Sequence, residues 1–138
     1  MGLTLFTMTV SLAYSCTPGK VTGGGQITLS PQRGSFGFNI MYSAGYTVPK
    51  GELEYIDHET GMKVHAHDMT LLEVYDSNTK ADFWGTCTID HVSGFTFHVY
   101  VEDNGEPGKN DVFRIWLSNG YSAGGTLLNG NIQIHKTP

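Results

Sequence analysis

Apolar and polar side chains alternate along much of this chain, and this period of two constrains the fold more than any other feature. Residues 36–42 and 95–102 show the alternation most clearly, and shorter stretches follow at 112–117 and 132–135. A period of two places every second side chain on the same face of a β-strand, so that one face is apolar and the other polar. No window of a dozen residues has its apolar positions at helical spacing. The pattern therefore predicts strands throughout.

Turn-forming residues separate these stretches at intervals of about eight to twelve residues. Asn-Gly and Pro-Gly pairs favour tight reversals of the chain. The reversals are predicted at Ser93-Gly94, Asn104-Gly105, Pro107-Gly108, Asn119-Gly120 and Asn129-Gly130. Connections this short leave no room for helical crossovers. We therefore expect an all-β fold, an antiparallel β-sandwich (jelly-roll or Ig-like) of about ten short strands.

The run Gly23-Gly24-Gly25 precedes the predicted strand at residues 26–29. Glycine has no Cβ, so such a run predicts either a bulge or the close approach of another backbone. A phosphate-binding loop would need a following helix and a Lys-Ser or Lys-Thr pair, and the sequence offers neither here. A structural role is therefore expected for these glycines.

Composition excludes several classes of protein. The chain has 138 residues, which fits one domain, and 15% of them are charged, too few for a coiled coil or a charge-rich disordered chain. Eight Lys and Arg against thirteen Asp and Glu give a formal net charge of −5. A nucleic-acid-binding protein needs positive charge to displace counterions from phosphates. We expect no nucleic-acid partner and no membrane span.

The N-terminal segment allows two interpretations. Residues 3–15 are apolar and end in Ala13-Tyr14-Ser15, whose small residues fit cleavage of a secretion signal before Cys16, although no Lys or Arg precedes them. The same segment alternates strictly, which favours a strand. We expect residues 1–20 to form an N-terminal arm and residues 21–138 to form the β-sandwich domain.

Read as a strand, the N-terminal arm has two further interpretations. It pairs within its own sheet, or it completes the sheet of a neighbouring subunit, because an open strand edge accepts any strand of suitable register. In the second case repeated head-to-tail pairing builds a filament. The side chains that would fill the neighbour's groove are Phe6, Met8, Val10, Leu12 and Tyr14.

Residues 21–136 resemble the post-COAP type of bacterial and archaeal secreted modules, which follow "choice of anchor" domains in large surface proteins. The segments that carry the resemblance are VTGGG (21–25), GSFGF (34–38), LEYIDH (53–58), DNGEPGKND (103–111), GYSAGGTL (120–127) and GNIQIHK (130–136). The resemblance implies an extracellular β-sandwich and assigns no catalytic residue or ligand. The first twenty residues lie outside it.

The two cysteines, Cys16 and Cys87, are expected either to form a disulfide or to leave Cys87 as a core residue of its strand. A bridge would close a long loop and anchor the N-terminal arm, with a stabilisation of roughly 4 kcal/mol in chain-entropy models. A dense disulfide scaffold or a four-cysteine zinc site is excluded by the count.

Two sets of residues are candidate metal ligands. His65 and His67 are two positions apart and would share one face of a strand, where they are either a chelating pair or a solvated surface pair. The loop from 103 to 111 offers hard oxygen ligands that suit Ca²⁺, although a hydrogen-bonded Asx turn explains the same residues without an ion. Its candidate ligands are Asp103, Asn104, Glu106, Asn110 and Asp111. No other cofactor is expected.

Catalysis finds little support, because no nucleophile stands in a recognised motif, and we expect a protein that is not an enzyme. Exposed aromatic rings are the alternative, since they stack on sugar rings. Trp84 and Tyr121 are the candidate ligand-binding aromatics, with Phe83 expected to point inward and Trp84 outward.

These observations predict a non-catalytic structural or adhesive protein of the extracellular space or cell surface. Its expected partners are copies of itself, joined into a filament by the donated N-terminal strand, or other cell-surface proteins. The first alternative is a carbohydrate-binding surface module with a polysaccharide partner. The second is a monomeric surface module stabilised by calcium or another metal.

Overall fold

The computed structural model describes residues 19–42 and 47–135, and these residues form nine β-strands and a single-turn 3₁₀ helix. The elements are β1 (Gly19–Thr28), β2 (Arg33–Tyr42), β3 (Lys50–Asp57), β4 (Lys63–Tyr75), β5 (Lys80–Ile89), β6 (Val92–Glu102), η2 (Gly108–Asn110), β7 (Val112–Leu117), β8 (Ser122–Thr126) and β9 (Asn129–His135). The predicted all-β class is confirmed. No helix in this part of the chain is long and apolar enough to cross a membrane.

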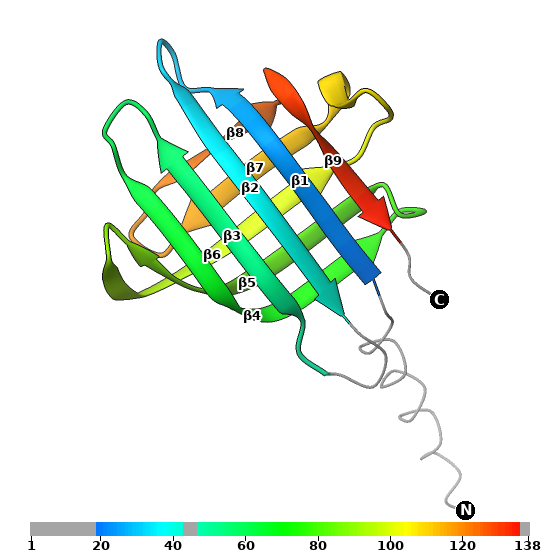
Figure 1. Cartoon of the computed structure of the whole chain (residues 1–138), viewed down its shortest axis with the longest axis horizontal. Helices are drawn as coiled ribbons and strands as arrows, with labels where there is room; N and C mark the ends of the chain where they lie inside the picture. The colour runs from blue at the N-terminus through cyan, green and yellow to red at the C-terminus, as the bar shows by residue number, and fades with distance from the viewer. Residues whose placement is uncertain (1–18, 43–46, 136–138) are drawn as a thin grey trace, which may run out of the picture.

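The nine strands form one antiparallel sheet with the order β8-β7-β6-β5-β4-β3-β2-β1-β9. Strands β1 to β8 follow one another as a meander, and β9 returns to pair with β1. In Figure 1 the layer of β9, β1, β2 and β3 crosses in front of β5, β6 and β7, because the sheet curls round on itself. The fold is therefore a curled half-barrel, and a sandwich of two separate sheets is not shown.

Strand β4 bends the sheet from one layer to the other. Its first residues pair with β3, but beyond Ala66 only β5 remains as its neighbour. Register shifts interrupt the β4–β5 ladder between His65 and Asp68 and between Met69 and Leu71. Bulges of this kind bend a strand and increase its twist. At the bend a Cβ on Gly85 would lie 2.3 Å from the carbonyl oxygen of Asp68, so only glycine fits this close approach.

The core lies on the inner, concave face of the sheet. Aromatic rings from the two layers meet there: the centroids of Phe36 on β2 and Phe113 on β7 are 4.0 Å apart, and those of Phe38 and Phe83 are 5.1 Å apart. The apolar alternation predicted for residues 36–42 and 95–102 is confirmed, because the inward positions of β2 and β6 are buried from Phe36 to Tyr42 and from Phe97 to Val101.

The glycine run of β1 allows the close approaches that were predicted. A Cβ on Gly25 would lie 2.2 Å from the carbonyl oxygen of Asn129 on β9, and a Cβ on Gly23 would lie 2.7 Å from the ring of Phe38. Gly25 has a φ of 157°, which L side chains rarely adopt. These glycines therefore let β9 and a core ring pack directly against β1.

Some predicted reversals lie elsewhere. The β5–β6 hairpin turns at Asp90 and His91, whose φ angles are 50° and 70°, and the predicted pair Ser93-Gly94 lies within β6. In a type I′ turn both central residues have a positive φ, and Asp and His tolerate a positive φ better than most residues. Asn129-Gly130 likewise begins β9 instead of preceding it.

The two ends of the sheet meet at one corner. Only Leu127 and Leu128 connect β8 to β9, and the Leu128 N–H bonds to the carbonyl of Gln26 on β1 at 2.7 Å. Among residues 19–42 and 47–135, β8 pairs only with β7, and β9 pairs only with β1. Within this part of the chain the sheet therefore keeps two edges instead of closing into a barrel.

Candidate ligand-binding face

Three aromatic side chains line up across β5, β6 and β7 on the outer face of the sheet. Trp84 is paired opposite His98, and His98 is paired opposite Trp116. Phe83 and Ile115 are fully buried, and since side chains alternate between faces, their neighbours point outward. The expected orientation of Phe83 and Trp84 is therefore confirmed. We call Trp84, His98 and Trp116 the aromatic row.

The rings of the aromatic row stack on one another. The Trp84 and His98 centroids are 4.7 Å apart with an interplanar angle of 11°, and those of His98 and Trp116 are 4.8 Å apart at 21°. At one end Leu71 on β4 is paired opposite Trp84, whereas at the other end Trp116 is paired opposite the small side chain of Ser122. Trp116 is 39% exposed and has an open ring face on the β8 side.

A hollow of about 350 Å³ runs beside the aromatic row. Its lining residues come from β4, β5, β6 and β7 and from the position just after β7: Thr70, Trp84, Gly85, Thr86, Thr96, Phe97, His98, Trp116, Leu117 and Ser118. The Ser118 hydroxyl accepts the N–H of Thr96 at 2.9 Å. The surface that this hollow offers a ligand is therefore mainly apolar, with few polar groups.

A hydrogen-bonded carboxylate lies on the other side of the aromatic row. One oxygen of Asp82 is 2.6 Å from His98 Nε2, and the other accepts the hydroxyl of Tyr75 at 2.6 Å. Burial, together with the hydrogen bond to the Asp82 carboxylate and the nearby negative charges, raises the pKa of Tyr75 to about 12. Both oxygens of Asp82 are thus engaged in orienting ring side chains.

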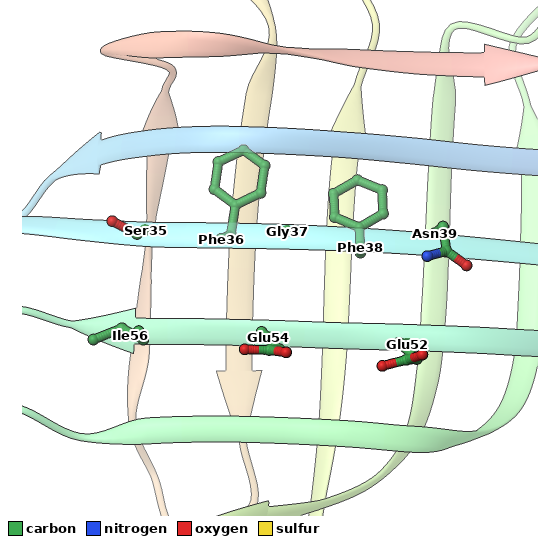
Figure 2. A pocket seen from close by; sticks show the side chains of 8 residues that line it. All are labelled: Ser35, Phe36, Gly37, Phe38, Asn39, Glu52, Glu54 and Ile56. Atoms are coloured by element: carbon green, nitrogen blue, oxygen red, sulfur yellow. The ribbon is translucent and has the colours of Figure 1, made fainter.

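A second, polar hollow of about 420 Å³ lies on the outer face of β2 and β3. Figure 2 shows its lining, in which Gly37 leaves the backbone of β2 bare between Ser35 and Asn39, while Glu52 and Glu54 line β3 beside it. A Cβ on Gly37 would meet no atom within 4 Å. This hollow offers hydroxyl, amide and carboxylate groups but no exposed aromatic ring.

A hydrogen-bonded serine and histidine lie at the end of the polar hollow. Ser35 Oγ is 2.8 Å from His58 Nε2, and Gln26 Nε2 donates to the same oxygen at 3.1 Å. The neighbouring carboxylate of Asp57 accepts the hydroxyl of Tyr121 instead, at 2.8 Å. Ser35, His58 and Asp57 therefore do not form a chain of the kind that activates a nucleophile.

The predicted histidine pair lies on the outer face of β4. The ring centroids of His65 and His67 are 5.7 Å apart, which confirms that the two side chains share a face. His65 Nδ1 lies 3.8 Å from Glu54, and His67 Nδ1 lies 3.7 Å from Asp68. Across residues 19–42 and 47–135, no three His, Cys, Asp or Glu side chains gather in a group that could hold a metal ion.

The predicted calcium ligands lie together in the β6–β7 loop, where they bond to the backbone and to β9. Asp111 is fully buried, and its two oxygens accept the N–H groups of Asn104 at 2.7 Å and Ile132 at 2.8 Å. Asp103 accepts the N–H of Ile134 at 3.0 Å. Glu106 accepts the side-chain amide of Asn131 at 2.8 Å, and the Asn110 carbonyl accepts that of Asn104 at 2.8 Å. Burial raises the pKa of Asp111.

Tyr121 lies against the core, apart from the aromatic row. Its hydroxyl donates to Asp57, and Tyr55 therefore donates to the Tyr121 oxygen at 2.7 Å. Burial raises the pKa of Tyr121, and the bonds to Tyr55 and Asp57 act in the same direction. Of the two aromatics predicted to bind a ligand, only Trp84 belongs to the aromatic row.

Cys87 is a buried free thiol on β5, and burial raises its pKa to about 11. Its predicted partner Cys16 lies outside the described residues. The predicted assembly residues lie outside them as well: Phe6, Met8, Val10, Leu12 and Tyr14.

Sequence reasoning missed His98 and Trp116 as members of the site. A signal existed, because both occupy the polar phase of alternating strands, but only the strand pairing aligns them with Trp84. No family model matches the chain, and no curated protein or solved structure matches it either.

Proposed function

We propose that this chain is a non-catalytic, extracellular binding module whose aromatic row binds a polysaccharide. The observation that carries the proposal is the exposed indole of Trp116 at the end of a stack of rings, next to a mainly apolar hollow whose lining includes three threonines and a serine. Sugar rings present C–H groups on their faces and hydroxyls at their edges. An aromatic face beside hydrogen-bonding groups complements both.

The stack supplies rigidity as well as area. His98 lies between two indole rings and is hydrogen-bonded to Asp82, so the position of Trp116 is fixed before any ligand arrives. A preformed surface loses little conformational freedom on binding, which leaves more of the contact free energy for affinity. The full engagement of Asp82 supports binding over hydrolysis, because hydrolysis of a glycoside needs two available carboxyl groups.

Replacement of the exposed indole tests the proposal. The protein is passed over a panel of insoluble polysaccharides and run in affinity gels that contain soluble ones. We expect Trp116→Ala to weaken binding at least about tenfold, which corresponds to about 1.4 kcal/mol. Met41→Ala is the matched control, because Met41 is also 39% exposed but lies on β2, away from the row.

Either of two outcomes rejects the polysaccharide proposal. One is that no polysaccharide of the panel retains the wild-type protein. The other is that Trp116→Ala and Met41→Ala bind as tightly as the wild type. Thermal unfolding of both variants ensures that a loss of binding is not a loss of fold.

A second candidate function is a filament subunit that assembles by strand donation. The observation that favours it is the edge of β8, which has no strand partner among the described residues. At the β7–β8 hairpin the Leu117 N–H bonds to the Tyr121 carbonyl, so alternation along the ladder directs the backbone groups of Ser122, Gly124 and Thr126 away from β7. Residues 3–15 of another copy supply an alternating segment that fits such an edge.

The strand-donation candidate has a test that depends on side-chain phase. We expect Val10→Asp with Leu12→Asp to abolish fibres in electron micrographs and to leave a monomer in sedimentation. The matched control, Thr9→Asp with Ser11→Asp, adds the same charge in the opposite phase of the alternation and retains assembly. Fibres formed by both double variants would reject strand donation.

A further inference from the structure

The open side of Trp116 borders a strip of small residues. Strand β8 presents Ser122 and Gly124 on the outer face, opposite Trp116 and Arg114 of β7. The indole ring therefore stands beside a shallow surface formed by Ser122 and Gly124, which we call the β8 floor.

Arg114 is the cation that borders this floor. It lies two positions before Trp116 on the same face of β7, and a Cβ on Gly124 would lie only 2.3 Å from its Cγ. The absent side chain of Gly124 thus leaves room for the stem of Arg114 to lie over β8. No hydrogen bond or ion pair within the described part of the chain involves the Arg114 guanidinium.

The acidic residues nearest to Arg114 on this face, Asp82 and Glu102, lie on the same side of the aromatic row, and both are engaged with other partners. Asp82 is on β5 and is bonded to His98 and Tyr75. The pKa of Glu102 is lowered by hydrogen bonds from Tyr100 and Asn104 and by the charge of Lys80, without a contribution from Arg114. Arg114 is therefore the charged group that faces the β8 floor.

We propose that Trp116, Arg114 and the β8 floor form a subsite for a carboxylated sugar, in particular a uronate unit of an acidic polysaccharide. This inference rests on the proposed polysaccharide-binding function and names its substrate class. The sugar ring stacks on the open face of Trp116, and its carboxylate pairs with the planar guanidinium of Arg114. Arginine forms two parallel hydrogen bonds with a carboxylate, so the pairing fixes orientation as well as charge.

The test compares two polymers with the same backbone: polygalacturonate, which carries free carboxylates, and its fully methyl-esterified form, in which each carboxyl is a neutral methyl ester. Binding is measured by affinity electrophoresis and calorimetry at one ionic strength. We expect the wild type to bind the acid at least about tenfold more tightly than the ester. Arg114→Gln removes the preference for the acid, whereas Lys109→Gln, which loses an exposed cation on η2, keeps the preference.

The outcomes separate the two proposals. Equal, Trp116-dependent binding of the acid and the ester rejects the uronate subsite while the polysaccharide-binding function stands. An acid preference that persists in Arg114→Gln also rejects the subsite. Failure of the wild type to bind either polymer or any polysaccharide of the wider panel rejects both. Arg114→Lys keeps the charge without the planar fork, and we expect it to retain only part of the preference.

Discussion

The two edges of the sheet are finished in different ways. On β9 the N–H groups of Ile132 and Ile134 end on the carboxylates of Asp111 and Asp103, and Figure 1 shows η2 and its loop beside the start of this strand. Strand β8 has no comparable cap along its free edge in the described part of the chain. Unpaired edges invite pairing with another strand. The β6–β7 loop thus substitutes for a strand at one edge and leaves the other edge available.

Each edge also has a buried carboxylate, and the two differ in electrostatics. Burial raises the pKa of Asp57 beside the β7–β8 hairpin, but hydrogen bonds, above all from Tyr121, outweigh it and lower the pKa overall. The pKa of Asp111 beside β9 is raised by burial and by the nearby charges of Asp103 and Glu106. We call Asp111 and Asp103, which accept the edge N–H groups of β9, the β9 cap. The fold thus disfavours the charged form of Asp111 in this cap, whereas it favours the charged form of Asp57.

Removal of the β9 cap should have the largest effect. Asp111→Ala leaves the N–H groups of Asn104 and Ile132 without their acceptor, and we expect it to lower the free energy of unfolding by about 3 kcal/mol. Urea unfolding measures the loss. Asp90→Asn is the control, since among the described residues the Asp90 side chain accepts just the exposed N–H of Lys63 and Asn tolerates the positive φ of this turn, and its loss should be about 1 kcal/mol or less. Equal losses would contradict the assigned role of Asp111.

Removal of the contact on the β8 side should cost less. Tyr121→Phe deletes one hydroxyl, so Asp57 loses a donor and Tyr55 loses an acceptor, with an expected loss of about 1–2 kcal/mol in urea unfolding. Tyr75→Phe removes the same atom from a tyrosine that is 42% exposed and should cost less. A greater loss for Tyr75→Phe would show that the Asp57 contact does not hold the hairpin.

The two carboxylates should give opposite pH dependence. Asp57 has a lowered pKa in the fold, so its contribution is present above the ordinary value of 3.8 and is lost as pH falls through the folded value. Asp111 has a raised pKa, so folding takes up a proton and stability increases as pH falls from neutrality toward 3.8. The free energy of unfolding of Asp57→Asn, Asp111→Asn and the wild type, measured at a series of pH values from 7 downward, gives the contribution of each carboxylate. Parallel curves would contradict this assignment.

Asp103, the second carboxylate at the β9 edge, should protect a single backbone amide, that of Ile134. Asp103→Ala should cost about 1 kcal/mol, because the partly buried N–H of Ile134 regains water more readily than the fully buried N–H of Ile132. Hydrogen exchange measured by NMR should accelerate at Ile134 and stay unchanged at Ile132. Unchanged exchange at Ile134 would show that Asp103 does not protect it.

A charge on the available edge should have the smallest effect on stability. Thr126→Lys on β8 should change the free energy of unfolding by less than about 0.5 kcal/mol, yet reduce self-association, since lysines block edge pairing. Sedimentation at several concentrations measures association. Gln133→Lys places the same charge on β9 and should leave association unchanged. If the two variants self-associated to the same extent, the proposed difference in pairing between the β8 and β9 edges would be contradicted.

The alternation in the sequence predicted the strands and their buried faces, but not the shape of the sheet. The inward positions from Phe36 to Tyr42 are buried as expected. The curl arises at the bulges near Asp68 and Met69, where the chain carries no turn signal that sets them apart from an ordinary strand. A period of two records which face a residue occupies, and it contains no information about which strand lies beside it.

The candidate site, too, was predictable in part from the sequence and in part only from the strand pairing. Trp84 was predicted as an outward aromatic, but its stack with His98 and Trp116 depends on the registers among three consecutive strands, β5, β6 and β7. Tyr121 looked equally exposed beside its turn, yet its hydroxyl reaches Asp57, 64 positions away. Residue type indicated which chemistry was available, and the ladder decided which groups meet.

The sequence by itself determined that this chain is a β protein with tight turns, an acidic charge and outward aromatic residues. Only the tertiary structure decided that the strands form one curled sheet, that the acidic loop caps β9, and that Trp116 has an open face beside Arg114. The physical reason is the range of the forces involved. Alternation and turn chemistry act between neighbours in the chain, whereas edge capping and ring stacking depend on contacts that form only after the strands have paired.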